Sequence, residues 1–356
     1  MSDDVEAIAN SLAAHFEGLA PETAREKPPS PVHWELLERA LGVPSQELHR
    51  VFEVARRVRA LFRGDQVSLY YPGNDFPSIS VTGGECSLDC SHCGKKYLHG
   101  MIPAPTPDAL YETCLELERK GARGCLVSGG CDEKGAVPLE PFLDCIARVK
   151  RETNLVLNLH TGLLSEAVAD GLAQAGVDVV SFDVNVDPEV IRDVYHLDAT
   201  PEDYARALKY LVDRGVTVVP HVCLGLNRGR LVSEFDALKF LSEFPFEVLV
   251  FIVLIPPRDP PAANLFSEPS PEDLARLVAV ARLRYPPVDV ALGCMRPKNP
   301  RARLQFEKGA VEAGASRLVM PSPKTRAWLV KKGYDLRVKK GCCAVHGEPE
   351  ALLRAG

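Results

Sequence analysis

The sequence SVTGGECSLDCSHCGKKYLHGM, residues 80–101, guides the interpretation of the whole chain. Within it, Cys86, Cys90 and Cys93 have the spacing C-x3-C-x2-C on a loop rich in glycine and serine. Three thiolates this close together can bind one iron–sulfur cluster, and a cubane cluster usually has four cysteine ligands. The triplet therefore predicts a cluster with one iron left open, because an open position distinguishes a catalytic metal site from a closed structural one.

A structural zinc site is the alternative interpretation of the same cysteines. It would need a fourth Cys or His ligand at a similarly short spacing. His92 lies between two of the cysteines, where it can hardly turn back onto the same metal, and His99 is a poor fourth ligand. The sequence therefore favours an iron–sulfur cluster over zinc.

Composition limits the size of the core and the class of partner. With 356 residues, 46% of them hydrophobic, the chain can bury one large core or one barrel with small appendages. A net charge of −6 without a basic block argues against a nucleic-acid partner. The first residues lack the pattern of a signal peptide, and the longest apolar run, residues 248–255, is too short to span a bilayer. We therefore expect a cytoplasmic protein that uses its eleven cysteines for metal binding or catalysis, without membrane contact.

Apolar runs alternate with amphipathic helical segments after Pro77, which predicts parallel strands joined by crossover helices. The predicted strands are Ile79–Thr82, Cys125–Ser128, Leu155–His160, Val177–Val184, Val216–Leu224, Val248–Ile255, Val288–Gly293 and Arg317–Met320. The predicted helices lie near 107–120, 139–151, 165–174, 201–214, 232–243, 271–284 and 302–313.

This alternation predicts an α/β fold, a (β/α)8 TIM-type barrel, with an open six-stranded barrel and a C-terminal extension as the alternative. Residues 1–72 have helical spacing and are expected to form an N-terminal helical cap on a barrel spanning residues 73–322. The extension, residues 323–356, is expected to cover the barrel mouth. In either barrel the active site belongs at the carboxyl ends of the strands, where the cysteine loop also lies.

The cysteine triplet, with His92 before its last cysteine, resembles the signature of the radical S-adenosylmethionine (SAM) superfamily. The biotin-synthase-related branch is similar at further segments: Tyr71-Pro72, Pro77–Gly83, Cys90–Cys93, Ser128–Asp132, Val219–His221, Leu254–Pro256 and Gly293–Pro297. This resemblance implies that Cys86, Cys90 and Cys93 bind a [4Fe-4S] cluster whose open iron binds SAM. Reductive cleavage of SAM then yields a 5′-deoxyadenosyl radical.

Residues at the predicted strand ends are candidates for binding SAM. Glycines at a strand end let the backbone approach a ligand closely, and Ser128, Gly129 and Gly130 resemble the stretch that binds the amino group of SAM, although Cys131 replaces the usual acidic residue. Polar residues at strand ends point into a barrel mouth more often than not. On these grounds, or by resemblance, the further candidates are His160, Asp183, Asn185, His221 and Ile255.

The remaining cysteines suggest a second cluster. Cys131 and Cys294 end predicted strands, and Cys342 and Cys343 lie in a tail that could fold back over the same mouth. Thiols gathered there could hold an auxiliary iron–sulfur cluster, with Cys223 as a spare ligand and Arg296 or His346 completing the shell. Ordinary buried thiols are the alternative.

The branch resembles one component of the two-protein lipoyl synthase. That resemblance implies a sulfur-insertion enzyme acting on a protein-bound octanoyl chain, with an auxiliary cluster consumed as the sulfur source. Its partners would be an octanoylated lipoyl-domain or carrier protein, a companion radical SAM protein and an electron donor of the ferredoxin or flavodoxin type. The alternatives are a radical SAM dehydrogenase or rearrangement enzyme, and a non-enzymatic iron–sulfur carrier or scaffold.

Overall fold

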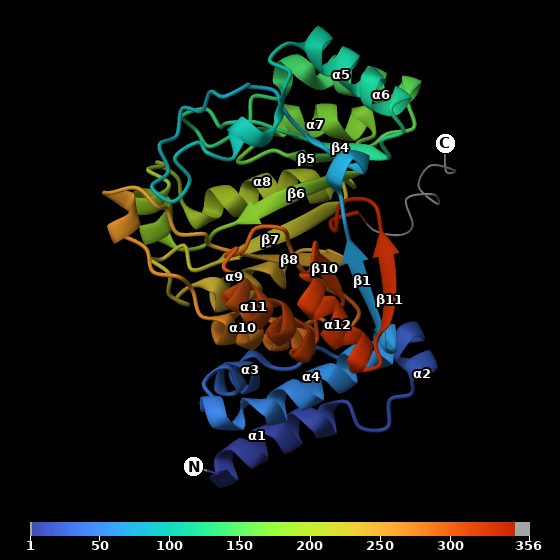
Figure 1. Ribbon diagram of the computed structural model, residues 1–356, viewed down its shortest axis with the longest axis vertical. Coiled ribbons are helices and arrows are strands. Elements are labelled where there is room, and N and C mark those ends of the chain that lie inside the picture. The colour runs from blue at the N-terminus through green and yellow to red at the C-terminus, as the bar shows by residue number, and fades with distance from the viewer. Residues whose placement is uncertain (1, 346–356) are drawn as a thin grey trace.

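One parallel sheet collects all the strands of the described chain. Figure 1 shows the computed structural model, which describes residues 2–345. The strand order is β11-β1-β10-β9-β8-β7-β6-β5-β4-β2-β3. The strands are β1 (Gln66–Tyr70), β2 (Ser78–Ser80), β3 (Ile102–Pro103), β4 (Gly124–Ser128), β5 (Val156–His160), β6 (Val179–Val184), β7 (Val218–Leu224), β8 (Val248–Val253), β9 (Asp289–Leu292), β10 (Arg317–Val319) and β11 (Asp335–Lys339).

The predicted α/β class is confirmed, and all eight predicted strands are present as β2 and β4 to β10. The sheet is open, as in the alternative form, but it holds all eight predicted strands rather than six. β1 pairs with the free side of β10 and β11 pairs with β1, while β3 pairs with the free side of β2. Within residues 2–345 no pairing joins β11 to β3, so the sheet is a curled half-barrel rather than a closed ring.

Helices cover the outer face of the sheet (Figure 1). The barrel helices are α5 (Pro107–Arg119), α6 (Leu143–Glu152), α7 (Glu166–Ala175), α8 (Pro201–Asp213), α9 (Glu234–Leu241), α10 (Pro271–Arg284), α11 (Pro300–Glu312) and α12 (Pro323–Lys331). Capping explains several of their starts. The Thr106 hydroxyl accepts from the N–H of Ala109 at 3.2 Å, and Thr200 and Asp203 form a reciprocal capping box. These contacts satisfy N–H groups that the first turn of a helix leaves unpaired.

The N-terminal segment packs beneath the barrel helices (Figure 1). It contains α1 (Ser2–His15), α2 (Pro21–Glu26), α3 (Trp34–Leu41) and α4 (Leu48–Arg63). Arg276 of α10 donates to the carbonyl oxygens of Leu41 and Val43, each at 2.6 Å, which fixes this segment on the barrel. The segment is not wholly helical, because β1 lies within residues 1–72.

The inner face of the sheet carries a buried cluster of its own. Its members from the strands are Tyr70, Val179, Val219, Val248, Val250, Ala291 and Val319. Cys343 and Ala344, which follow β11, belong to the same cluster. The chain after β11 therefore fills part of the barrel interior.

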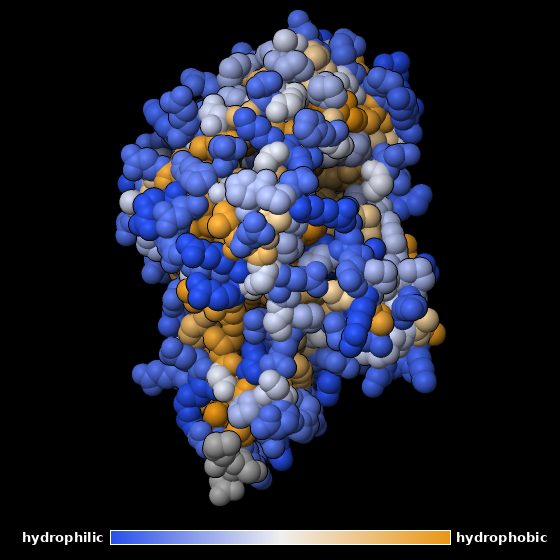
Figure 2. Space-filling model, turned by 60° about the vertical axis from the view of Figure 1, so that its left-hand side comes forward, coloured by the Kyte–Doolittle hydropathy of each residue, from blue (hydrophilic) through white to orange (hydrophobic). Residues whose placement is uncertain are grey.

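One face of the molecule can be followed in Figure 2. Figure 2 shows hydrophilic side chains over most of the visible face, with hydrophobic side chains scattered between them. None of the helices in residues 2–345 combines the length and the apolar character needed to cross a membrane.

Candidate functional site: two groups of thiols in one half-barrel

The cysteine loop, residues 81–101, leaves the carboxyl end of β2 and is tied to the next strand end. The Thr82 hydroxyl donates to the carbonyl of Glu85 at 2.8 Å and accepts from the N–H of Gly130 at 2.7 Å. Gly130 follows β4, which pairs with β2 in the sheet. The loop that carries the cysteines and the loop after β4 therefore form one hydrogen-bonded unit.

Gly130 permits a very close approach between these two loops. A Cβ atom at Gly130 would lie 2.0 Å from the carbonyl oxygen of Glu85 and 2.5 Å from the Cβ of Cys86. The next residue, Cys131, donates its backbone N–H to the Cys86 Sγ at 3.2 Å. Only glycine fits at this contact. The glycine-rich stretch is therefore built against the cysteine loop, while its contact with SAM stays a prediction.

Cys86, Cys90 and Cys93 are half-buried on the loop. Burial, and then the neighbouring Cys93 and Cys86 thiols, together raise the pKa of the Cys90 thiol to about 12. The three sulfurs thus lie close enough to influence one another, and iron binding would displace their protons. Among residues 2–345 no three His, Cys, Asp or Glu side chains are already arranged around a metal position. The fit to a cluster therefore comes from the donor chemistry and the shared loop.

The cysteine loop also docks on the segment that follows β6. The Cys90 thiol donates to the carbonyl of Tyr195 at 3.6 Å, and the N–H of Ser91 donates to the carbonyl of Val194 at 2.8 Å. The ring of His92 lies 5.2 Å from that of Tyr195, and burial lowers the pKa of His92 to about 4. Its Nδ1 atom has no hydrogen-bond partner among the described residues. The loop thus holds a neutral imidazole beside the cysteines.

Three predicted site residues come together at the strand ends. His160 ends β5, Asp183 is the penultimate residue of β6, and His221 lies in β7. The two imidazole rings are 5.8 Å apart. Burial lowers the pKa of His221 to about 4 and also lowers that of His160, while the Asp183 carboxylate opposes both shifts. Both histidines are therefore neutral at pH 7 and face a carboxylate.

The other predicted SAM contacts surround the same end of the sheet. Ser128 is the last residue of β4, and Ile255 follows β8 and is half-buried. Asn185 is buried after β6, where its Oδ1 accepts from the N–H of Asp187 at 3.0 Å. The Nδ2 of Asn185 has no partner among the described residues. The structure thus places all these residues at the end where the cysteine loop lies, and their ligand contacts stay predictions.

A second group of thiols comprises Cys294, Cys342 and Cys343. Burial raises the pKa of Cys294, and the Cys342 thiol adds to that shift. Cys294 and Cys342 in turn raise the pKa of Cys343, together with its burial. Each of these thiols therefore influences another one, and their shared binding of an auxiliary cluster stays a prediction.

Cys131 is not part of this second group, which corrects the expected four-cysteine site. Its backbone contacts Cys86. Burial raises the pKa of its thiol to about 12, and the largest charge effects come from Cys86 and Cys90. Cys131 therefore lies beside the first group of thiols.

The spare candidate Cys223, in β7, is half-buried, and burial raises the pKa of its thiol well above the usual range.

The tail, residues 341–345, lies inside the half-barrel and not across its mouth. It packs on Val156, Val179 and Val248, which are the first residues of β5, β6 and β8. Those strands begin at the end opposite the cysteine loop. The described part of the predicted extension therefore differs from the expected cover, because the chain turns inward after β11. His346 lies outside the described residues.

Cys342 has an environment that stabilises its thiolate. The Asn158 Nδ2 donates to the Cys342 Sγ at 3.5 Å. A hydrogen bond from the Cys343 thiol, then others from the Ala344 N–H and Asn158, lower the pKa of Cys342 to about 7, although burial opposes the shift. Cys342 is thus the most readily ionised of the thiols for which a shift is resolved.

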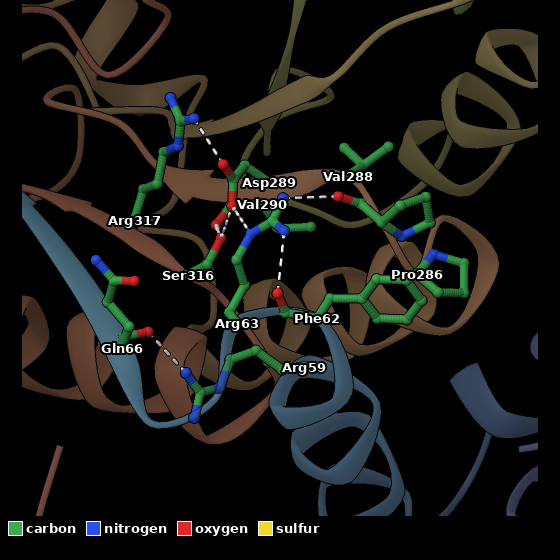
Figure 3. A network of polar contacts seen from close by, with 12 residues as sticks. Arg59, Phe62, Arg63, Gln66, Pro286, Val288, Asp289, Val290, Ser316 and Arg317 are labelled. Carbon is green, nitrogen blue, oxygen red and sulfur yellow. Dashed lines mark hydrogen bonds and ion pairs between the residues drawn. The ribbon is translucent and has the colours of Figure 1, made fainter. Parts of the chain in front are cut away.

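Figure 3 shows a network of charged residues that includes Arg63, Asp289 and Arg317. The Arg317 guanidinium donates to the carbonyls of Cys343 at 2.6 Å and Val345 at 3.0 Å. It also donates to Asp289 at 2.6 Å, and Asp289 accepts from Arg63 of α4 at 2.6 Å. Although burial opposes it, the two guanidinium groups lower the pKa of Asp289. The network links the N-terminal helices to the cysteine tail.

Sequence reasoning missed Asn158, Asp289 and Arg317 as parts of this arrangement. The sequence did mark two of them as unusual. Asp289 and Arg317 are charged residues at the first positions of adjacent, otherwise apolar strands. Arg296 is held mainly by other groups, although its Nε has no partner among the described residues. Its guanidinium forms a buried ion pair with Glu307 at 2.6 Å and donates to two strand-end carbonyls.

A parallel half-barrel whose cysteine triplet follows its first barrel strand is the architecture of radical SAM proteins. The sequence model of the Radical SAM superfamily matches residues 80–231. The crystal structure of methylornithine synthase (PylB) superposes with a TM-score of 0.61 at 18% identity, covering 85% of this chain and 86% of that protein. The structural likeness supports the fold.

The chain is also similar in sequence to curated biotin synthases. A biotin synthase from Heliobacterium modesticaldum is 33% identical over 140 residues, which are 38% of this chain and 41% of that protein. A biotin synthase from Geotalea daltonii is 22% identical over 327 residues, or 86% of this chain and 94% of that protein. Residues 80–231 thus form a Radical SAM domain, and the chain is homologous to biotin synthases. The predicted branch is thereby confirmed, and the lipoyl synthase assignment stays a prediction.

Proposed function

We propose that this radical SAM enzyme inserts sulfur into unactivated C–H bonds of a protein-bound octanoyl chain, as one component of a lipoyl synthase. The observation that supports this best is the presence of two separate groups of thiols in one half-barrel. Sulfur insertion needs both a source of radicals and a source of sulfur. The first group of thiols would serve as the source of radicals, and the second group would serve as the source of sulfur.

The first group would bind the SAM cluster. Cys86, Cys90 and Cys93 would be its ligands, with one iron left open. A [4Fe-4S] cluster with SAM bound supplies the reductive cleavage that yields a 5′-deoxyadenosyl radical. The glycines after β4 let the backbone pack closely against the cysteine loop, and the polar residues at the strand ends would orient the bound SAM.

The second group, Cys294, Cys342 and Cys343, would hold an auxiliary iron–sulfur cluster. Each insertion exchanges a C–H bond of the substrate for a C–S bond, so a sulfide must lie within reach of the activated carbon. The buried tail brings two cysteines into the barrel interior and fills its lower part. That filling would exclude water from the reacting carbon.

Metal analysis tests the two sites separately. Anaerobically reconstituted wild-type protein is expected to contain roughly eight irons per chain, falling to roughly four in Cys294→Ala. Four irons in both proteins would remove the auxiliary site. Turnover with an octanoyl-lysyl peptide, a reductant and the companion protein should then give a thiolated product, and deoxyadenosine without thiolation would reject sulfur insertion.

One observation favours a second candidate, a radical SAM dehydrogenase or rearrangement enzyme. The upper interior carries a carboxylate and two neutral imidazoles, at Asp183, His160 and His221, which suit a polar substrate better than an octanoyl chain. In that case SAM cleavage should accelerate with polar substrates and not with the octanoyl peptide. Measuring deoxyadenosine formation against a panel of both kinds separates the two functions.

A further inference from the structure

A polar hollow lies beside strands β1, β9, β10 and β11. Its volume is about 230 Å³, whereas a single ordered water needs roughly 10–15 Å³. Its lining includes Gln66, Asp289 and Arg317, the first residues of β1, β9 and β10. The hollow therefore lies toward the end of the half-barrel opposite the cysteine loop. None of the cysteines lines it, so it is separate from both groups of thiols.

The strand register places these residues on one face of the sheet. Gln66, Ser68 and Tyr70 alternate along β1 and therefore share a face. Ser68 pairs with Arg317 of β10, and Tyr70 pairs with Lys339 of β11. Tyr70 belongs to the buried cluster on the inner face, whose other strand members are valines and an alanine. A polar strip thus interrupts an otherwise apolar face, and buried polar surface is the more informative kind.

Several hydrogen-bonding groups of this strip are not used by the fold. Within residues 2–345 the Tyr70 hydroxyl, the Ser68 hydroxyl and the side-chain amide of Gln66 have no hydrogen-bond partner. Tyr70 is only 4% exposed, and burial raises the pKa of its hydroxyl, although Arg317 opposes the shift. The hydroxyl therefore keeps its proton at neutral pH and can donate to a ligand in the hollow.

The charges that line the hollow do not balance. Among the described residues Asp289 is the one carboxylate of the lining, and it accepts from both Arg63 and Arg317 at 2.6 Å (Figure 3). Two guanidinium groups around one carboxylate leave an excess of positive charge, and a concave surface of one sign attracts the opposite charge.

Both lining arginines also keep free donors. Each guanidinium has five N–H groups. Arg63 donates to Asp289 and to two backbone carbonyls, and Arg317 does the same. Two N–H groups of each side chain therefore remain for a ligand.

Two further buried arginines strengthen the positive field behind the hollow. Arg59 is 2% exposed and donates to the carbonyl of Gln66 at 2.9 Å, and Arg282 is fully buried and donates to the carbonyl of Val288 at 2.8 Å. Burial lowers the pKa of both arginines. Neither forms an ion pair within residues 2–345, although a buried charge is normally paired.

We propose that this hollow binds a small oxyanion, either a free ion such as phosphate or the phosphate group of a larger molecule. Guanidinium N–H groups and hydroxyls suit the several acceptor oxygens of such an ion. Arg317 also donates to the carbonyls of Cys343 and Val345, so the bound anion would contact the side chain that holds the tail. The proposal does not depend on sulfur insertion.

Titration calorimetry with inorganic phosphate, at constant ionic strength on anaerobically reconstituted protein, tests the site. Wild type should show one saturable site per chain, and Arg63→Gln should bind roughly 10- to 100-fold more weakly, the range for hydrogen bonds to charged groups. Arg214→Gln is the matched control, because it also removes a half-buried arginine that pairs with carboxylates. It should bind phosphate like wild type. No saturable binding by wild type, or equal weakening in the two variants, overturns the proposal.

A hydroxyl deletion tests the location without changing the charge. Tyr70→Phe should bind phosphate roughly 2- to 10-fold more weakly, as expected for one hydrogen bond. Tyr111→Phe, which removes a surface hydroxyl bonded to Glu152, should bind it normally. Circular dichroism would show that the variants are folded. Wild-type affinity in both Tyr70→Phe and Arg63→Gln would place the ion elsewhere and overturn the site.

Competition separates the two sources of the oxyanion. Tighter binding of glycerol 3-phosphate than of inorganic phosphate supports a phosphate ester as the occupant, and weaker binding supports a free ion. Chloride that displaces phosphate at equal concentration would overturn recognition of an oxyanion. Because these titrations need neither SAM nor an octanoyl substrate, their failure leaves the proposed sulfur insertion standing, and failure of thiolation leaves the anion site standing.

Discussion

The two groups of thiols are positioned by different physical means. Cys86, Cys90 and Cys93 lie on a loop held by backbone contacts, where a glycine permits close packing against Cys86. Cys342 and Cys343 lie in a tail held by a buried network of arginines and an aspartate (Figure 3). The first site depends on the absence of a side chain, and the second depends on charged ones. Each group should therefore fail under a different kind of substitution.

Removing a loop thiol should have the largest effect. We expect Cys90→Ala to abolish reductive SAM cleavage, because an incomplete ligand set would not hold the SAM cluster. Cys294→Ala should keep uncoupled SAM cleavage while losing the second cluster. The measurement is deoxyadenosine formed per chain with dithionite as reductant. Equal cleavage by wild type and Cys90→Ala would contradict the assignment of the first group.

Breaking the charged network should have the next largest effect. In Arg317→Met, the Asp289 carboxylate loses one of its two arginines and the tail loses two carbonyl contacts. Removing one partner of a buried pair typically costs about 3–5 kcal/mol. Urea denaturation should show this loss, and Cys342 should react faster with thiol reagents.

A surface arginine provides the control for this substitution. Arg192→Met removes an exposed pair with its neighbour Asp193, so it should change stability by less than about 0.5 kcal/mol. Unaltered Cys342 reactivity in Arg317→Met would show that the network does not position the tail.

Packing at the glycine should have a smaller effect on stability but a local effect on the first site. A methyl group at Gly130 would clash with the backbone of Glu85 and with Cys86. Gly130→Ala should therefore cost about 1–3 kcal/mol, the usual range for overpacking, and slow SAM cleavage. Gly84→Ala is the matched control on the same loop, because its new methyl group would meet no atom within 4 Å. Equal behaviour of the two variants would refute the close-packing argument.

The contrast also shows what the sequence could predict. The eight strands β2 and β4 to β10 were predictable, because each is a short apolar run between turn signals. The cysteine loop and the glycines were predictable because short spacing places their side chains close together whatever the rest of the chain does. Local patterns of this kind do not depend on distant partners.

Long-range pairing was not predictable. β1 is a five-residue strand inside a segment with helical spacing, and its pairing with β10 and β11 joins residues far apart in the sequence. The placement of Cys342 depends on Arg317, Asp289 and Arg63, which are far apart in the sequence. Nothing local to the tail indicates which end of the barrel it enters.

The pH dependence of stability should be the smallest effect that distinguishes the two regions. The pKa of Asp289 is lower in the folded protein because of Arg317 and Arg63, whereas an unfolded Asp titrates near 3.9. The ionised carboxylate therefore stabilises the fold above about pH 4, and this contribution is lost as the pH falls further. One proton gives a slope of about 1.4 kcal/mol per pH unit.

Asp289→Asn should lack this part of the acid sensitivity, so its unfolding free energy should decrease less steeply below about pH 4 than that of wild type. Ser316→Ala provides the control, since it removes a hydrogen bond to Asp289 but leaves both arginine pairs in place. It should keep the slope of wild type. Denaturation by urea between pH 2.5 and pH 6 measures both slopes. An identical slope in all three proteins would mean that the second group of thiols is not held by an ionised carboxylate, and the distinction between the two regions would then rest on packing alone.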